Sequence, residues 1–245
     1  MPLRGSPPPR PPAAHAGRSP ASGRIGIFAT DLDRTLLSAG GSPTEAGREA
    51  LRTVQGLGLR ALLVSGRRLD ELRRYARAFG RFDGLVGENG AVVEVPVGAP
   101  PVVLGRRVAG AVHRRLEGAW GSEGEFGQVV ASFPRHRSAR LARLLAPLPV
   151  RLVANVDRVM VLPEGISKHT GVVRALARMR RSRWGYSAIG DGENDVEMLR
   201  YAALSGAVAN ATLGVRRVAD YVSRGTGANG VLEFVAGPLA RAVRT

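Results

Sequence analysis

An apolar run that leads directly into two aspartates constrains the fold of this 245-residue chain more than any other feature. Residues 25–29 predict a buried strand, and Asp31, Asp33 and Thr35 follow where that strand would end. A second apolar run leads into the acidic segment 190–195. Open α/β sheets bind ligands beyond the carboxyl ends of their strands, and carboxylates are ligands that Mg²⁺ prefers. The two segments together predict a magnesium-dependent site for phosphoryl transfer.

Aspartate and threonine after a strand are also common as loop or helix-capping residues, and two further motifs weigh against that interpretation. Residues 62–66 predict a strand that ends at Ser65 and Gly66. The serine hydroxyl can donate to a phosphate oxygen, and the glycine lets a backbone N–H approach the same oxygen. Lys168 is the single lysine among 36 basic residues. Because arginine and lysine serve equally well on most solvated surfaces, a lone lysine predicts a position that needs a compact ammonium group.

These motifs, in their order along the chain, resemble those of the haloacid dehalogenase (HAD) superfamily. The four motifs are Asp31-x-Asp33-x-Thr35, Ser65, Lys168 and Gly190-Asp191-x-x-Asn194-Asp195. Segments 88–91, 196–199 and 219–222 are similar to the Cof-type, subfamily IIB phosphatases in particular. The resemblance covers about residues 24–236. The chain differs from the family pattern at two places. Arg34 stands where glycine is commonest in the family, and segment 208–211 is a shortened form of the family's usual segment.

The resemblance implies an α/β fold, with a Rossmann-like parallel-sheet core, helices on both faces of the sheet, and a small inserted α+β cap domain. The alternation of strand and helix patterns up to residue 87 agrees with this fold. We expect the core to comprise residues 23–90 and 164–245, and the C2-type cap to comprise residues 91–163. Within the cap, residues 91–95, 101–104 and 127–133 are predicted to be strands. Residues 1–22 hold seven of the 16 prolines and no acidic residue, which predicts a disordered Pro/Arg-rich tail.

The resemblance also implies roles for individual residues. Asp31 would be the nucleophile that forms an aspartyl-phosphate, and Asp33 would be the general acid and base. The metal ligands implied for Mg²⁺ are Asp31, Asp33 through its backbone carbonyl, Asp191 and Asp195, the last either as a ligand or as support for one. The residues implied in binding the substrate phosphate are Thr35, Ser65, Gly66, Lys168 and Asn194.

Composition favours a cytoplasmic enzyme that acts on a small molecule. The chain has no cysteine, so it has no disulfides and no cysteine-based chemistry. It contains neither an apolar run of the roughly 18 residues that span a bilayer nor an N-terminal signal-peptide pattern. The net charge of +16 suits anionic partners, but the arginines are scattered and aromatic residues make up only 5%. Stacking platforms for bases are therefore scarce, and we expect no specific nucleic-acid partner and no membrane partner.

The function predicted from these observations is that of a Mg²⁺-dependent phosphatase for a small phosphorylated metabolite, either a sugar phosphate or a phosphoglycolate-like acid. A phosphomutase on the same scaffold is one alternative, and formation of an isomer instead of phosphate release would identify it. A non-catalytic basic protein that binds nucleic acid is another. It would show salt-sensitive retention of nucleic acid that survives loss of Asp31. The sequence predicts neither the particular substrate nor the oligomeric state.

Overall fold

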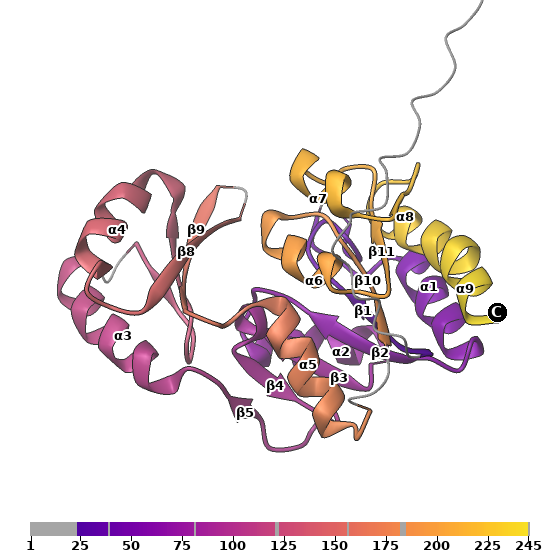
Figure 1. The fold of residues 1–245 in the computed structure, drawn as a ribbon, viewed down its shortest axis with the longest axis horizontal. Coiled ribbons are helices and arrows are strands. Elements are labelled where there is room, and N and C mark those ends of the chain that lie inside the picture. Colours follow the sequence, from indigo (N-terminus) through magenta and orange to yellow (C-terminus); the bar gives the residue numbers. More distant parts are fainter. Residues whose placement is uncertain are drawn as a thin grey trace, which may run out of the picture.

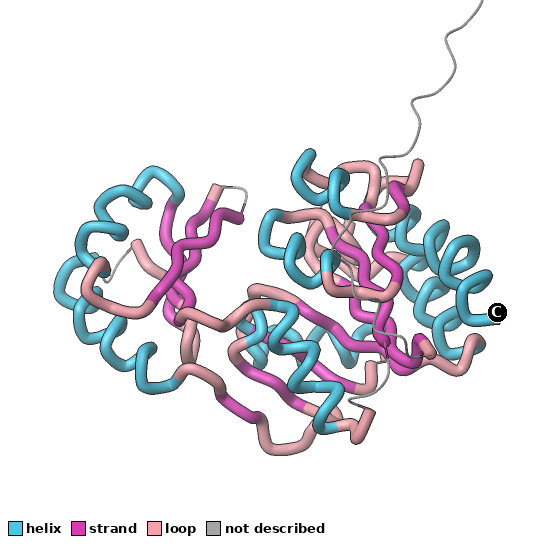
Figure 2. The backbone as a smooth tube through the Cα atoms, viewed as in Figure 1, coloured by secondary structure: helices cyan, strands magenta, loops and turns pink. Residues whose placement is uncertain are grey.

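The computed structural model describes residues 24–38, 40–80, 82–120, 123–155, 157–181 and 185–244. The tail predicted over residues 1–22 lies outside these ranges. The described chain forms an eight-stranded sheet and a separate four-stranded sheet, and Figure 2 shows the two groups of strands apart from each other. None of the described helices is both long and apolar enough to cross a membrane.

The large sheet has the strand order β12-β11-β10-β1-β2-β3-β4-β5. Its strands are β1 (Ile25–Thr30), β2 (Arg60–Val64), β3 (Gly84–Gly87), β4 (Val92–Glu94), β5 (Val102–Val103), β10 (Gly185–Gly190), β11 (Leu204–Ala207) and β12 (Tyr221–Val222). The strands from β12 to β3 pair in parallel, and β4 and β5 continue the sheet in antiparallel pairing. Every residue of β3 and β10 is buried, as expected for parallel strands that are covered on both faces.

Helices cover both faces of the large sheet. They are α1 (Glu45–Gly56), α2 (Leu69–Phe79), α5 (Lys168–Arg178), α6 (Val196–Arg200), α7 (Leu213–Val218), α8 (Gly227–Phe234) and α9 (Ala240–Arg244). Figure 1 shows α1, α8 and α9 on one side of the sheet and α5 and α6 on the other. This is the predicted Rossmann-like core, and its main apolar cluster runs through the sheet and both helical layers.

Residues 106–163, here called the small layer, contain the second sheet. Its elements are α3 (Arg106–Trp120), β6 (Glu125–Phe126), β7 (Ala131–Pro134), α4 (Ser138–Leu145), β8 (Val150–Asn155) and β9 (Arg158–Pro163). The antiparallel strands have the order β6-β7-β9-β8, and α3 and α4 lie on the face turned away from the large sheet (Figure 1). Leu116, Phe133 and Leu141 belong to an apolar cluster that is separate from that of the large sheet.

The strands predicted over residues 91–95 and 101–104 are present as β4 and β5, but they do not join the sheet expected of a cap that begins at residue 91. Strand β4 pairs with β3, and β5 pairs with β4, so both extend the large sheet. The segment that forms the second sheet with its two helices begins at Arg106. Of the strand predicted over residues 127–133, only the last three residues are in a strand, β7, which pairs with β6. Residues 127–130 connect these two strands and face the core.

Candidate active site

Strands β1, β2 and β10 bring the predicted residues to one edge of the large sheet. Thr30, the last residue of β1, pairs with Ile189 of β10, and β2 runs parallel on the other side of β1. The backbone N–H of Asp31 donates to the carbonyl oxygen of Ile189 over 3.1 Å. Asp31, Ser65 and Asp191, which follow these strands directly, therefore lie together at the carboxyl edge, where the sequence predicts a site.

Asp31, Asp191 and Asp195 form a buried acidic cluster. One carboxylate oxygen from each lies within 4.8 Å of the others. The backbone N–H groups of Asp191 and Gly192 each donate to Asp195 Oδ2 over 3.0 Å, which fixes that carboxylate. Burial raises the pKa of Asp31 well above its ordinary value. Burial, followed by the charge of Asp195, raises the pKa of Asp191 to about 6.

This donor set fits Mg²⁺, because it consists of carboxylate oxygens whose mutual repulsion a divalent cation would offset. The local backbone supports the cluster. A Cβ on Gly190 would lie 2.5 Å from the carboxylate carbon of Asp195, so only glycine leaves room for that side chain. Thr35 Oγ1 donates to Asp191 Oδ1 over 3.4 Å, and Arg34 Nε lies 3.3 Å from Asp191 Oδ2. The departure from the family at Arg34 therefore places a cation against a candidate metal ligand.

The lone lysine lies in the middle of this cluster. Lys168 is the first residue of α5, and its Nζ donates to Asp31 Oδ1 and Asp195 Oδ1 at 2.6 Å each. The side chain is 1% exposed. Burial lowers its pKa, but Asp195 and Asp31 outweigh burial and hold the pKa above the ordinary value. The ammonium group therefore stays charged, and it fixes the direction of the Asp31 carboxylate.

The Asp33 carboxylate lies outside the acidic cluster. Its side chain is 44% exposed and pairs with Arg67, whose Nη2 lies 2.7 Å from Asp33 Oδ1 and whose Nε lies 2.9 Å from Oδ2. Arg67 also donates to Glu71 over 2.8 Å and stacks over the ring of Tyr75. The motifs read from the sequence do not single out Arg67 as a candidate site residue. Its position directly after Ser65-Gly66, at the end of β2, is the signal that could have revealed it.

The structure divides the five predicted phosphate-binding residues into two groups. Ser65, Gly66 and Asn194 line the cavity described below, and the Ser65 hydroxyl oxygen accepts the backbone N–H of Arg67. Thr35 is fully buried beside Asp191, and Lys168 is buried between two carboxylates. These last two residues are thus placed to hold aspartates in position.

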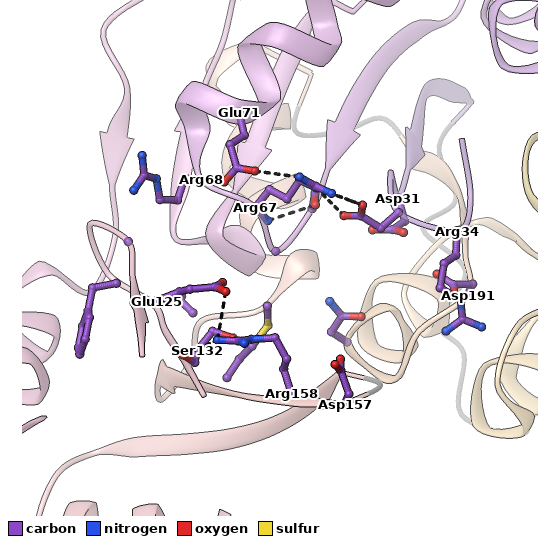
Figure 3. A pocket seen from close by; sticks show the side chains of 18 residues that line it. Asp31, Arg34, Arg67, Arg68, Glu71, Glu125, Ser132, Asp157, Arg158 and Asp191 are labelled. Atoms are coloured by element: carbon purple, nitrogen blue, oxygen red, sulfur yellow. Dashed lines mark hydrogen bonds and ion pairs between the residues drawn. The ribbon is translucent and has the colours of Figure 1, made fainter. Parts of the chain in front are cut away.

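A cavity of about 580 Å³ opens between the acidic cluster and the small layer. Figure 3 shows Arg67 and Glu71 on one side of this cavity and Ser132 and Arg158 on the other. The core contributes the residues Asp31, Asp33, Arg34, Ser65, Gly66, Arg67, Arg68, Glu71, Asp191 and Asn194. The small layer contributes Glu125, Phe126, Gly127, Val130, Ser132, Asp157, Arg158 and Met160. A ligand in the cavity would therefore contact both layers.

Glu88 joins the two layers beside the cavity. This residue follows β3, is 2% exposed, and has a positive φ of 51°. Its carboxylate accepts the backbone N–H groups of residues 128, 129 and 130 over 2.8–3.0 Å. A Cβ on Gly127 would lie 2.4 Å from Glu88 Oε2, so the contact also requires glycine there. In the sequence, Glu88 stands out only as part of a family-like segment, and its residue type does not predict this contact.

Comparison with known proteins identifies the family of this chain. A family model described as haloacid dehalogenase-like hydrolase matches residues 28–99 and 153–235, and the chain belongs to this family. It is 30% identical over 223 residues to a phosphoglycolate phosphatase of Aeropyrum pernix, covering 87% of this chain and 93% of that protein. A solved structure from Thermoplasma acidophilum has a TM-score of 0.75 at 16% identity, covering 89% of this chain and 99% of that chain.

A HAD subclass IIB sugar phosphatase of known structure has a TM-score of 0.64 at 17% identity, covering 81% of this chain and 93% of that chain. The resemblance to the HAD superfamily and the Rossmann-like α/β fold predicted from the sequence are thus confirmed. The stretch between the two matched parts of the family model, residues 100–152, falls mainly in the small layer.

Proposed function

We propose that this chain is a Mg²⁺-dependent phosphatase that hydrolyses a short phosphorylated carboxylic acid of the phosphoglycolate type through an aspartyl-phosphate. The observation that carries the proposal is the buried Asp31 carboxylate, held by Lys168 within an acidic cluster beside a cavity. Relatives that are named phosphoglycolate phosphatase and align along most of the chain support this class of substrate.

In the proposed reaction, a carboxylate oxygen of Asp31 attacks phosphorus as the ester bond to the leaving oxygen breaks. Asp33 gives its proton to that oxygen. Asp33 then takes a proton from a water molecule that attacks the aspartyl-phosphate, which releases inorganic phosphate and restores Asp31. Lys168 and the Ser65 hydroxyl offset the charge of the phosphoryl oxygens. Asp31, Asp191, Asp195 and the Asp33 carbonyl would hold Mg²⁺, which would supply further positive charge to the phosphoryl group.

In the structure, Arg67 determines where the Asp33 side chain lies. The guanidinium group binds both carboxylate oxygens and is itself held by Glu71 and Tyr75. This arrangement keeps Asp33 on the cavity wall, away from the ammonium group of Lys168. The pairing thus keeps the proposed proton donor apart from the cluster that holds the nucleophile.

In this proposal, the small layer is the cap of the enzyme and the remaining described residues form its catalytic core. The separate apolar cluster of the small layer, its contribution to the cavity wall, and its position in the gap of the family match all support this division. The core then comprises residues 24–105 and 164–244, which moves the predicted boundary from residue 91 to the start of α3.

The test is phosphate release from a panel of phosphate monoesters that includes 2-phosphoglycolate and sugar phosphates, with Mg²⁺ and with a chelator. We expect Mg²⁺-dependent release, with no isomeric phosphate ester formed. Asp31→Asn should lower turnover by several orders of magnitude and keep the fold, and acid-quenched wild-type digests should contain a phosphorylated Asp31 peptide. Glu49→Gln, the same kind of change on the exposed surface of α1, is the control and should remain active. Near-normal turnover by folded Asp31→Asn would overturn the covalent mechanism.

A further inference from the structure

The small layer presents one arginine to the cavity, Arg158, at the start of β9. Its Nε donates to Ser132 Oγ over 2.7 Å, and its Nη2 donates to the Ser132 carbonyl oxygen over 2.9 Å. Ser132 lies on β7, which pairs with β9. Two bonds to one residue of a neighbouring strand fix the plane of the guanidinium group, so little side-chain entropy is lost when Arg158 binds a ligand.

Arg158 differs from the other cavity arginines in how its charge is offset. Arg34, Arg67 and Arg68 each have a carboxylate oxygen of the core within 2.7–3.3 Å. The carboxylate nearest to Arg158 is that of Glu125, at 3.4 Å, on a side chain that is 75% exposed. A pair this exposed contributes little, and an anion from solution can replace Glu125. Arg158 Nη1 has no hydrogen-bond partner among the described residues.

We propose that Arg158 binds the carboxylate of the substrate and thereby selects phosphorylated carboxylic acids over neutral phosphate esters. This assignment rests on the proposed function, in which the phosphoryl group lies against Asp31 and Ser65 on the opposite wall of the cavity. The substrate then spans the cavity with its phosphoryl group on the core and its carboxylate on the small layer. Arginine suits this task because its planar fork matches the two oxygens of a carboxylate.

Asp157 also lines the cavity next to Arg158, and it sharpens the selection. A substrate without a negative charge at this end gains nothing from Arg158 that water does not supply. A carboxylate gains charge-assisted hydrogen bonds but must approach along the guanidinium group, away from Asp157. At this end of the cavity, the two residues thus favour a substrate with a compact anionic group such as a carboxylate, bound in one orientation. They disfavour a substrate that carries a larger and more highly charged group there.

The experiment compares 2-phosphoglycolate with ethyl phosphate, which replaces the carboxylate by a methyl group. For Arg158→Gln we expect kcat/KM on 2-phosphoglycolate to fall roughly 10- to 100-fold, chiefly through KM. On ethyl phosphate it should change by less than about 3-fold, because that substrate has no group for Arg158 to bind. Arg158→Lys should restore part of the activity on 2-phosphoglycolate. Arg137→Gln, which removes a small-layer arginine that pairs with Glu123 outside the cavity, is the matched control.

Equal losses on both substrates, or no loss on 2-phosphoglycolate, would overturn the role of Arg158 while leaving the phosphatase activity in place. If the wild-type enzyme releases phosphate from neither substrate, the proposed function is overturned, and the selection by Arg158 is overturned with it. If Arg158→Gln does not fold, Ser132→Ala provides the second variant. It removes the bond from Arg158 Nε to Ser132 Oγ and keeps the bond to the Ser132 carbonyl oxygen, so the guanidinium group is held less firmly, and turnover of 2-phosphoglycolate alone should weaken.

Discussion

Replacing Lys168 by arginine tests whether this site needs a compact cation or only a positive charge. In the structure, Nζ lies 2.6 Å from Asp31 Oδ1 and 2.6 Å from Asp195 Oδ1, and the side chain is 1% exposed. Lys168→Arg keeps the charge but brings a broader, planar group into a closed space. We therefore expect folding to survive while the Asp31 carboxylate moves.

The expected magnitudes follow from burial and contact geometry. Placing extra atoms in a filled site costs about 1–3 kcal/mol of stability. A shift of Asp31 by about 1 Å from its line of attack costs on the order of 100-fold in rate. Lys168→Met is the complementary change, because it leaves two buried carboxylates without their cation. Removing one partner from a buried ion pair costs about 3–5 kcal/mol, and Mg²⁺ should recover part of this loss.

The assay combines kcat for phosphate release with the free energy of unfolding, measured with and without Mg²⁺. Lys168→Arg should lose activity far more than stability, and Lys168→Met should lose both. If Lys168→Arg kept full turnover, the two short contacts would not be needed for catalysis, and the lone lysine would be a chance choice among equivalent basic residues.

Three further predictions concern the same region. Burial raises the pKa of Asp191 to about 6, so the folded metal-free chain binds a proton at Asp191 more tightly than the unfolded chain does. The stability that this bound proton contributes is lost as the pH rises through about 6. Mg²⁺ takes the place of the proton, so the rise in Tm that it produces should grow between about pH 5 and about pH 7, which thermal melts will measure. Glu88→Gln should cost about 2–3 kcal/mol in denaturant melts and speed hydrogen exchange at residues 128–130, because a neutral amide replaces the acceptor of three N–H groups. Gly190→Ala should weaken Mg²⁺ binding in calorimetric titrations, since its Cβ would displace the Asp195 carboxylate. An unchanged Mg²⁺ affinity would show that Asp195 does not support the metal.

The acidic cluster could be predicted from the sequence because its geometry follows from strand order alone. Parallel strands end at one edge, so residues that directly follow two neighbouring strands must be close in space. This reasoning needs the apolar runs before Asp31 and Asp191, and it also needs β1 and β10 to be neighbours, which the structure shows and the runs alone do not. It extends to Lys168 because a lone lysine in an arginine-rich chain is itself a signal, and the structure brings its Nζ to the same carboxylates.

The partner of a strand is harder to predict than the strand itself. The patterns at 91–95 and 101–104 do predict strands, and β4 and β5 are found there. Nothing in such short apolar runs shows which sheet they join. That choice depends on the turn at residues 88–90, where Glu88, Asn89 and Gly90 all have positive φ and direct the chain back along β3. The same limit applies to Asp33, because its pairing with Arg67 depends on side-chain direction.

Glu88 shows why contacts between the two layers could not be inferred from residue types. A glutamate after a strand is ordinarily solvated, yet here the turn buries it and three consecutive backbone N–H groups of the small layer surround its carboxylate. Val130, which provides one of these donors, and its neighbour Gly127 line the cavity, so the contact ties this part of the cavity wall to the turn after β3. Separating the layers would break three hydrogen bonds to a charged acceptor at once. The position of the small-layer wall relative to the core therefore depends in part on a charge that lies outside both the cavity lining and the acidic cluster.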